Sequence, residues 1–346
     1  MAYDGKSTMD FLLKQMNPDE KWLDRFRNGF NWAYSKFGQT VTVREERHPD
    51  YPEDIAYIFT ISSRMLKGVK DTPENRKVLN DYLFFNTSMC VPVFTPNDGT
   101  VRLLVRAAVN ESTYKWMGGF LSIAMAIQQH EVLKNAEQLA QLTHSEPLYY
   151  VHPKNGMRED VDEILKVYDD LIVSYGKIPS KCTDEEMKEV SDRYMQRFPC
   201  VLTTQGNSHI TTEFPLGEGD TSLCEFDARE CHVDYGTGLN VIQTFFKPGN
   251  EDEGIKLANY HNWQLSKALR SYGMGSFVYR NGFLVYRLFV PNFAYEKGLL
   301  LNLFLSSVIK AKGMNKYLGF PDWTQESYEK CIKRKLDIYS ILGSME

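Results

Sequence analysis

The sequence predicts an α+β protein built from two tandem similar domains, each an antiparallel sheet with helices packed on one face. The turn dipeptides Asp98-Gly99 and Asn281-Gly282 each lie between two strand-like segments, which is typical of a β-hairpin. Helix-like segments flank both hairpins, and the same order of segments occurs twice in the 346 residues. Antiparallel strands with helices at both sequence ends favour a sheet that helices cover on one face.

The first half is predicted to begin with a helix. Asn17-Pro18-Asp19-Glu20 combines a capping asparagine, a proline in the first turn and acids near the positive end of the helix dipole. Residues 21–37 then space their apolar side chains as a helix does, and Gly38 ends the segment. These apolar residues are Trp22, Leu23, Phe26, Phe30, Ala33, Tyr34 and Phe37.

Strands and two more helices are expected after this segment. The strands are rich in β-branched and aromatic residues, and Asp71-Thr72-Pro73 begins a helix in the manner described for Asn17. The expected elements are strands at 39–46 and 54–62, a helix from 71 to about 85, hairpin strands at 89–96 and 100–109, and a helix at 112–142.

The second half repeats this order. Thr183-Asp184-Glu185-Glu186 is a capping box that begins a helix, and Pro199 ends that helix. The later elements are strands at 200–205, 209–214, 222–228, 231–235 and 239–247, a helix at 250–272, a hairpin at 277–290 and a helix at 296–312.

The repeated order predicts a duplication. Aligning Arg106 with Arg287 places Val109 opposite Val290 without a gap. The alternative is coincidence, because α+β domains often contain a hairpin followed by a helix. The resulting domains are 1–145 and 182–346, joined by a linker at 146–181 that carries an amphipathic helix over 158–175.

Composition excludes several classes of protein. The chain is 42% apolar and 25% charged, with a net charge of −5, so a general nucleic-acid interface is not expected. Residues 299–309 form the most apolar segment, which is too short to span a bilayer. Six scattered cysteines and the lack of a secretory signal pattern favour reduced thiols and a cytoplasmic location.

The two hairpins predict a partner-binding surface. Strand alternation places Arg106 and Arg287 among apolar neighbours on the sheet face that is expected to point away from the helices. An arginine there can stack on aromatic rings and bind a carboxylate. The alternative is a cross-strand ion pair within the sheet, with Glu225, Asp227 or Glu45 as partner. The predicted partner-binding residues are Arg106, Arg287, Phe283, Phe289 and Leu104.

The order of elements resembles the type III secretion chaperone-like fold, including its YbjN-like branch. The resemblance lies in residues 258–265, 277–292 and 298–311 and in their counterparts at 78–85, 95–110 and 117–127, with Asn80 and Asn262 each about 20 residues before a turn glycine. It implies partner-protein binding or chaperoning, and a tandem copy could act as an internal pseudo-dimer. The extra strands around 203–235 depart from that fold.

No motif in the sequence identifies an enzyme or a cofactor site. Cys224, Cys231 and His232, with His209, could meet as a zinc site, but ordinary buried cysteines are the favoured interpretation. The leading hypothesis is therefore a non-enzymatic, chaperone-like protein that binds a protein partner or a second copy of itself, without a cofactor, a membrane or nucleic acid. The alternative is a hydrolase or small-molecule-binding protein with Cys224, His232 and the acids of 225–230 in a site between the domains.

Overall fold

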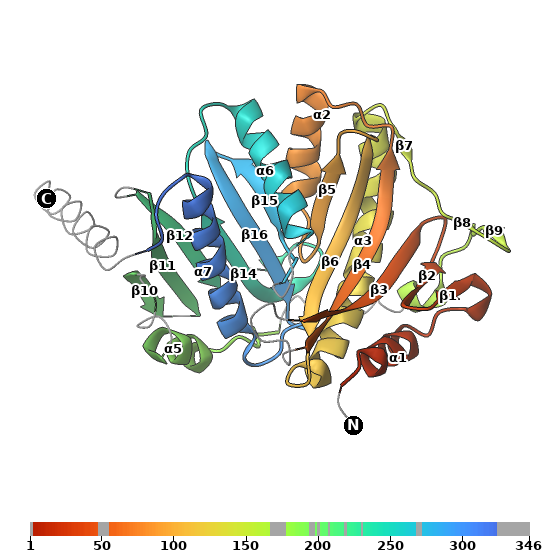
Figure 1. Ribbon diagram of the computed structural model, residues 1–346, viewed down its shortest axis with the longest axis horizontal. Coiled ribbons are helices and arrows are strands. Elements are labelled where there is room, and N and C mark those ends of the chain that lie inside the picture. Colours follow the sequence, from red (N-terminus) through yellow and green to blue (C-terminus); the bar gives the residue numbers. More distant parts are fainter. Residues whose placement is uncertain are drawn as a thin grey trace, which may run out of the picture. The chain divides into compact units, whose positions relative to one another are not determined.

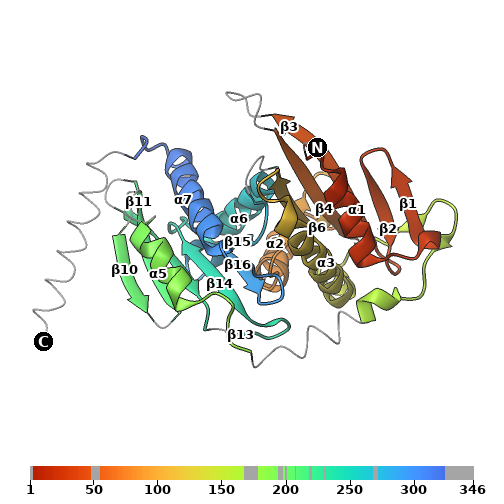
Figure 2. The same ribbon diagram turned by 90° about the horizontal axis from the view of Figure 1, so that it is seen from below.

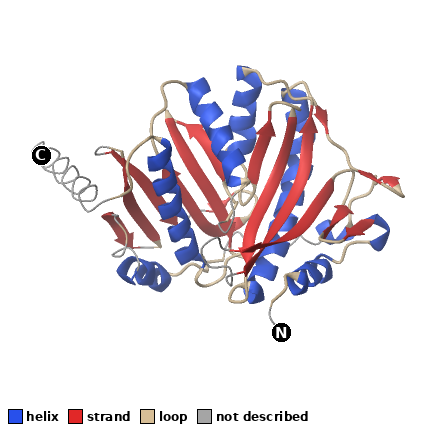
Figure 3. Cartoon of the chain, in the orientation of Figure 1, coloured by secondary structure: helices blue, strands red, loops and turns tan. Residues whose placement is uncertain are grey.

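The structure is a computed structural model that describes residues 3–47, 55–166, 178–193, 198, 201–206, 208–217, 220–229, 231–267 and 272–323. It is an α+β protein with two large antiparallel sheets, as Figures 1 and 3 show, so the predicted α+β class is confirmed, and the duplication stays a prediction. None of the described helices is both long enough and apolar enough to cross a bilayer.

The first sheet has the strand order β1-β2-β3-β4-β6-β5, and β7 adds to the end of β4. Its strands are β1 (Leu23–Phe26), β2 (Gly29–Ala33), β3 (Gly38–Arg47), β4 (Ile55–Lys67), β5 (Val91–Thr95), β6 (Thr100–Val109) and β7 (Glu146–Pro147). The helices are α1 (Lys6–Met16), α2 (Pro73–Val78), its π-helical continuation η2 (Leu79–Phe84) and the long α3 (Tyr114–Leu142), while η1 (Glu20–Trp22) is a short 3-10 turn. A small hairpin of β8 (Val151–His152) and β9 (Gly156–Met157) follows β7.

The second sheet has the order β10-β11-β12-β14-β16-β15, with β13 added to β14. Its strands are β10 (Val201–Gly206), β11 (His209–Leu216), β12 (Asp220–Asp227), β13 (Cys231–His232), β14 (Gly236–Thr244), β15 (Ser276–Arg280) and β16 (Phe283–Pro291). The helices are α5 (Asp184–Arg193), α6 (Glu251–Leu265) and α7 (Leu299–Tyr317). Leaving β13 aside, both sheets follow four strands, a helix, a hairpin and a helix along the chain, and both place the first hairpin strand at the edge.

The chain divides into two compact units, and the division differs from the predicted domain boundaries. The first unit is Met1–Gly176 with Gly249–Tyr279, and the second is Lys177–Pro248 with Arg280–Glu346. Helix α6 therefore belongs with the first unit although it lies within the second half of the sequence. Half of the predicted linker helix at 158–175 lies outside the described residues; in the described half, 163–166 are helical and 158–162 are not.

The predicted helix over residues 21–37 is wrong. These residues form the hairpin of β1 and β2, in which Phe26 pairs with Gly29 around an Arg27-Asn28 turn. Gly29 has no side chain to clash with β3, where an added Cβ would lie 2.0 Å from the Val41 carbonyl oxygen. Asn17 does not start a helix but ends α1 in the left-handed conformation, with a φ of 38°.

Helix α3 is held on the first sheet by buried polar side chains as well as by apolar packing. The Gln128 amide accepts hydrogen bonds from Gln39 and Ser63, each at 2.9 Å, and donates to the Ile61 carbonyl at 3.2 Å. Figure 2 shows α1 beside α3. Both helices therefore cover the same face of this sheet.

In the second unit, helix α7 has the corresponding role. The Gln243 amide of β14 donates to the Ser307 carbonyl of α7 at 3.1 Å, and Phe304 of α7 packs against Phe214 and Phe226. Alternate residues of β16, among them Leu284 and Leu288, are buried. They therefore face the α7 side of the sheet.

Candidate binding site on the first sheet

The helix-free face of the first sheet is defined by strand alternation. Ser63 bonds to α3, so its neighbours Ser62 and Arg64 point to the opposite face. The register places Ser62 opposite Leu104 and Arg64 opposite Arg102. This agrees with the predicted orientation of β6.

One end of this face is covered by the α6 segment of the same unit. Leu104 is buried. Arg106 pairs with Gly273 through two backbone hydrogen bonds of 2.9 and 2.8 Å, and its guanidinium Nη1 donates to the Ser266 carbonyl at 3.0 Å. Ser266 is the C-cap of α6, and a helix C-terminus favours a cation.

Gly273 allows this close approach. A Cβ at that position would lie 2.9 Å from both the Arg106 Cβ and the Leu265 carbonyl oxygen. Burial, followed by the nearby charge of Arg44, lowers the pKa of Arg106. Arg106 therefore holds the α6 segment on the sheet within the first unit, and its predicted role in partner binding stays a prediction.

The other end of the face carries a wall formed by residues 148–151. Strand β7 pairs with the end of β4, where β3 does not reach, and the Leu148 amide then donates to the Met65 carbonyl at 2.9 Å. The Tyr150 ring lies on Gly38, where an added Cβ would meet the ring at 2.5 Å. The missing side chain of Gly38 thus creates the space for Tyr150.

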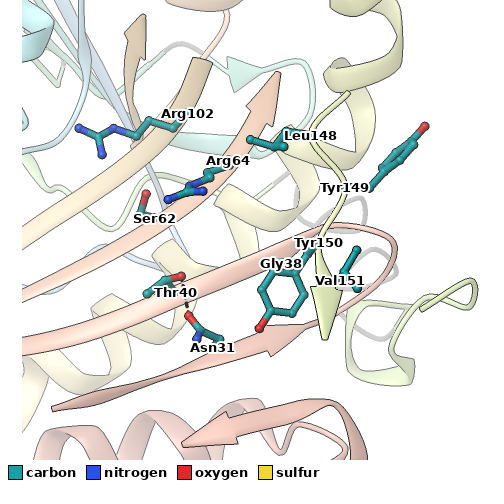
Figure 4. A pocket seen from close by; sticks show the side chains of 10 residues that line it. All are labelled: Asn31, Gly38, Thr40, Ser62, Arg64, Arg102, Leu148, Tyr149, Tyr150 and Val151. Carbon is teal, nitrogen blue, oxygen red and sulfur yellow. Dashed lines mark hydrogen bonds between the residues drawn. The ribbon is translucent and has the colours of Figure 1, made fainter. Parts of the chain in front are cut away.

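The wall and the sheet enclose a pocket of about 560 Å³, shown in Figure 4. This volume is within the usual range for small-molecule sites. The lining contains two arginines and no carboxylate. The lining residues are Asn31, Gly38, Thr40, Ser62, Arg64, Arg102, Leu148, Tyr149, Tyr150 and Val151.

The two arginines form a like-charge pair. Arg64 and Arg102 are directly opposite each other on β4 and β6, next to a register shift after Arg64. Among the described residues, neither has a carboxylate within ion-pair distance, and the Arg102 Nε is buried without a hydrogen-bond partner. Burial, followed by the charge of Arg64, lowers the pKa of Arg102, while Asp98 acts weakly in the opposite direction.

The remaining polar groups of the pocket can donate hydrogen bonds. Thr40 donates to the Asn31 side-chain oxygen at 2.8 Å, which leaves the Asn31 amide nitrogen as a donor. Burial, followed by the charge of Asp24, raises the pKa of Tyr150, so its phenol stays protonated. Figure 4 shows the Thr40–Asn31 bond and both arginine side chains extending in the same direction.

The predicted residues of the second unit lie on one face of β16 and differ in exposure. Phe289 is buried and its ring lies 5.0 Å from that of His232, whereas Phe283 is 40% exposed. Arg287 is opposite Ile242 in the β14–β16 register. Binding of a partner by these three residues also stays a prediction.

Two of the three alternative ion-pair partners, Glu45 and Asp227, pair with other arginines in the structure. Glu45 pairs with Arg47 at 2.9 Å, and Asp227 pairs with Arg229 at 2.5 Å. The register between β12 and β14 places Glu225 opposite Ile242. Neither Glu45 nor Asp227 has an ion pair with Arg106 in the described part of the chain.

The alternative catalytic residues are placed unfavourably for chemistry. Cys224 is fully buried, and burial raises the pKa of its thiol to about 12, so the reactive thiolate is scarce. Cys231 is exposed, and His232 packs on Tyr235 with ring centroids 4.8 Å apart. In the described ranges, no group of three or more His, Cys, Asp or Glu side chains could hold a metal ion.

Sequence reasoning missed the pocket because its arginines come from distant segments. Arg102 was placed on the correct face, but Arg64 lies 38 positions earlier in another strand, and only the register brings the two together. The hydroxyls of Ser62 and Thr40 are typical of any strand. The two arginines are brought together by the register of the strand pairs, and this register cannot be read from the sequence.

Comparisons with known proteins show no matching family model, no matching curated protein and no matching solved structure.

Proposed function

We propose that this chain is a non-enzymatic, chaperone-like protein that binds a protein partner on the helix-free face of its first sheet. The observation that carries the proposal is the Arg64–Arg102 pair, which lies on that face without an acidic partner within ion-pair distance in the described chain. Arginine is enriched at protein interfaces, and like charges directly opposite each other favour an anionic partner.

The strand order of the two sheets supports the chaperone-like part of the proposal. The same order of strands and helices in both halves is what a gene duplication would leave. It also fits the resemblance to the type III secretion chaperone-like fold. Since one fold can carry many functions, the binding face and not the fold bears the functional argument.

The location and the kind of partner belong to the same proposal. We propose a cytoplasmic protein whose partner presents acidic groups to the arginine pair, and a second copy of the chain is one candidate. The net charge of −5 disfavours nucleic acid as the partner, because phosphate backbones require a basic footprint.

Photo-cross-linking tests this function. A benzophenone side chain at Thr42, on the helix-free face, should give a protein adduct in native cells, while the same group at Lys14 on α1 should not. Mass spectrometry should place the adduct in an acidic segment of one partner. Equal adducts from both positions, or none from Thr42, would overturn the proposed function.

A further inference from the structure

The pocket on the first sheet has the chemistry of an anion site. Its charged lining groups are the guanidinium groups of Arg64 and Arg102, and Asp24 and Asp98 act on the pocket only from outside its lining. Guanidinium groups present several N–H donors in a planar fork that matches phosphate oxygens. A tetrahedral dianion can accept from both forks at once.

Neutral donors complete the arrangement. Ser62 lies on β4 two residues before Arg64, so strand alternation places both side chains on one face. The Asn31 amide nitrogen and the Tyr150 phenol line the same pocket. A phosphoryl group has three strong acceptor oxygens, which is the complement of such a donor-rich lining.

The free-energy balance favours an anion of two charges. Two cations are held opposite each other on adjacent strands, and the buried Arg102 Nε has no hydrogen-bond partner among the described residues. A buried donor without a partner destabilises the folded state. A doubly charged ligand compensates both arginines and provides an acceptor for that N–H group.

We infer that the pocket lined by Arg64, Arg102, Ser62 and Tyr150 binds the phosphoryl group of a phosphate monoester. The ester is either a free small molecule or a phosphorylated side chain of the protein partner. The second source, a phosphorylated side chain of the partner, rests on the proposed function. The chemistry of the site does not depend on it.

Calorimetric titration of the full chain with inorganic phosphate, at constant ionic strength and against sodium chloride, tests the site. Arg64→Gln and Arg102→Gln should each weaken phosphate binding at least tenfold. Arg44→Gln is the matched control, because Arg44 lies on the same sheet face, outside the pocket, and its removal changes the net charge equally. It should change the affinity less than twofold.

One further variant keeps the test decisive. Arg102→Lys keeps the charge but loses the planar fork, and it should weaken binding by an intermediate amount. Equal losses in Arg44→Gln and Arg102→Gln would show that phosphate responds to the general field of the protein. That result, or the absence of saturable binding to the wild-type chain, would overturn the inference.

The affinities of two ligands distinguish the two sources of the phosphoryl group. A phosphoserine peptide that binds tenfold more tightly than O-phosphoserine indicates a protein source, and equal affinities indicate a free ester. Phosphate binding without a Thr42 adduct would contradict the proposed function and keep the inference. A Thr42 adduct that persists in Arg102→Gln, together with no phosphate binding by the wild-type chain, would contradict the inference and keep the proposed function.

Discussion

Arg102 and Arg106 lie on one strand and one face, four residues apart, yet their surroundings differ completely. Arg106 is held by Gly273 and the Ser266 carbonyl of the α6 segment. Arg102 has a second arginine opposite it and lines a pocket. The strand sequence is similar at both positions, so the difference comes from what the rest of the chain places above each one.

The comparison shows that arginine has two different roles on the same strand. Where the chain covers the sheet, the Nη1 of the arginine donates to a helix carbonyl and contributes to stability, while its Nε is buried without a hydrogen-bond partner among the described residues. Where the chain leaves the sheet open, the arginines keep their hydrogen-bonding capacity for an external ligand. The sign of the stability change on mutation should therefore differ between the two regions.

The largest effect is expected at a fully paired arginine of the first unit. The Asp162 carboxylate accepts from Arg158 at 2.7 Å and from the Trp32 indole at 3.2 Å, and both members of the ion pair are buried. Asp162→Ala should lower the free energy of unfolding by about 3–5 kcal/mol, because it leaves a buried cation short of its counter-charge. Urea denaturation followed by circular dichroism measures this change.

Asp160 provides the matched control. It binds the same Arg158 at 3.1 Å, but its side chain is 71% exposed. Asp160→Ala should cost no more than about 1 kcal/mol, as exposed ion pairs do. Equal losses at Asp160 and Asp162 would show that burial does not set the strength of these pairs.

The next effect concerns the covered end of β6. Arg106→Gln removes a charged hydrogen bond to the Ser266 carbonyl and should lower the free energy of unfolding by about 1.5–3 kcal/mol. Guanidinium denaturation at pH 7 measures it. An unchanged stability would mean that the α6 segment is not held by this side chain.

A pH effect is expected in the same covered region. His261 of α6 packs on Phe277 with ring centroids 5.1 Å apart, and burial lowers its pKa to about 4. The unfolded chain has a normal histidine pKa near 6.5 and binds the proton first. Stability should therefore be complete above pH 6.5 and fall by up to about 1.4 kcal/mol per pH unit between pH 6.5 and 4.

His261→Gln isolates this contribution. The variant should lose less stability than the wild-type chain when urea denaturation at pH 7 is compared with denaturation at pH 5. A histidine of normal pKa would give identical pH dependence in both proteins. That outcome would contradict the packing of His261 on Phe277.

The smallest effect has the opposite sign. Arg64→Gln removes one of two like charges on adjacent strands and should raise the free energy of unfolding by about 0.2–1 kcal/mol in phosphate-free buffer. Arg44→Gln should be nearly neutral, since Arg44 and Glu46 form an exposed pair of 3.4 Å. A destabilised Arg64→Gln would mean that Arg64 has a structural partner.

Local signals predicted much of the fold. Helices α2 and α6 begin at the predicted positions, where the side chains of Thr72 and Asn250 cap them, and the Asn281-Gly282 turn connects β15 and β16. The helix predicted over residues 21–37 is wrong because the spacing of their apolar side chains suits both a helix and a hairpin. The Asn28-Gly29 dipeptide was the competing signal, and contacts with β3 decide in its favour.

The candidate site was less predictable than the fold. Strand alternation placed Leu104 and Arg106 on the helix-free face, but it could not show that Leu104 is buried or that the α6 segment covers Arg106. The pocket depends on Tyr150 resting on Gly38, more than 100 residues away in the chain. Such a long-range contact leaves no periodic pattern in the sequence.

The central claim is tested most directly by the effect of inorganic phosphate on the thermal unfolding midpoints of the wild-type chain, Arg102→Gln and Arg106→Gln. A ligand at 100 times its Kd stabilises the folded state by about 2.7 kcal/mol. We predict that phosphate raises the midpoint of the wild-type chain and of Arg106→Gln by the same amount and raises that of Arg102→Gln by no more than about half as much. An undiminished rise in Arg102→Gln, or its loss in Arg106→Gln, would contradict the account.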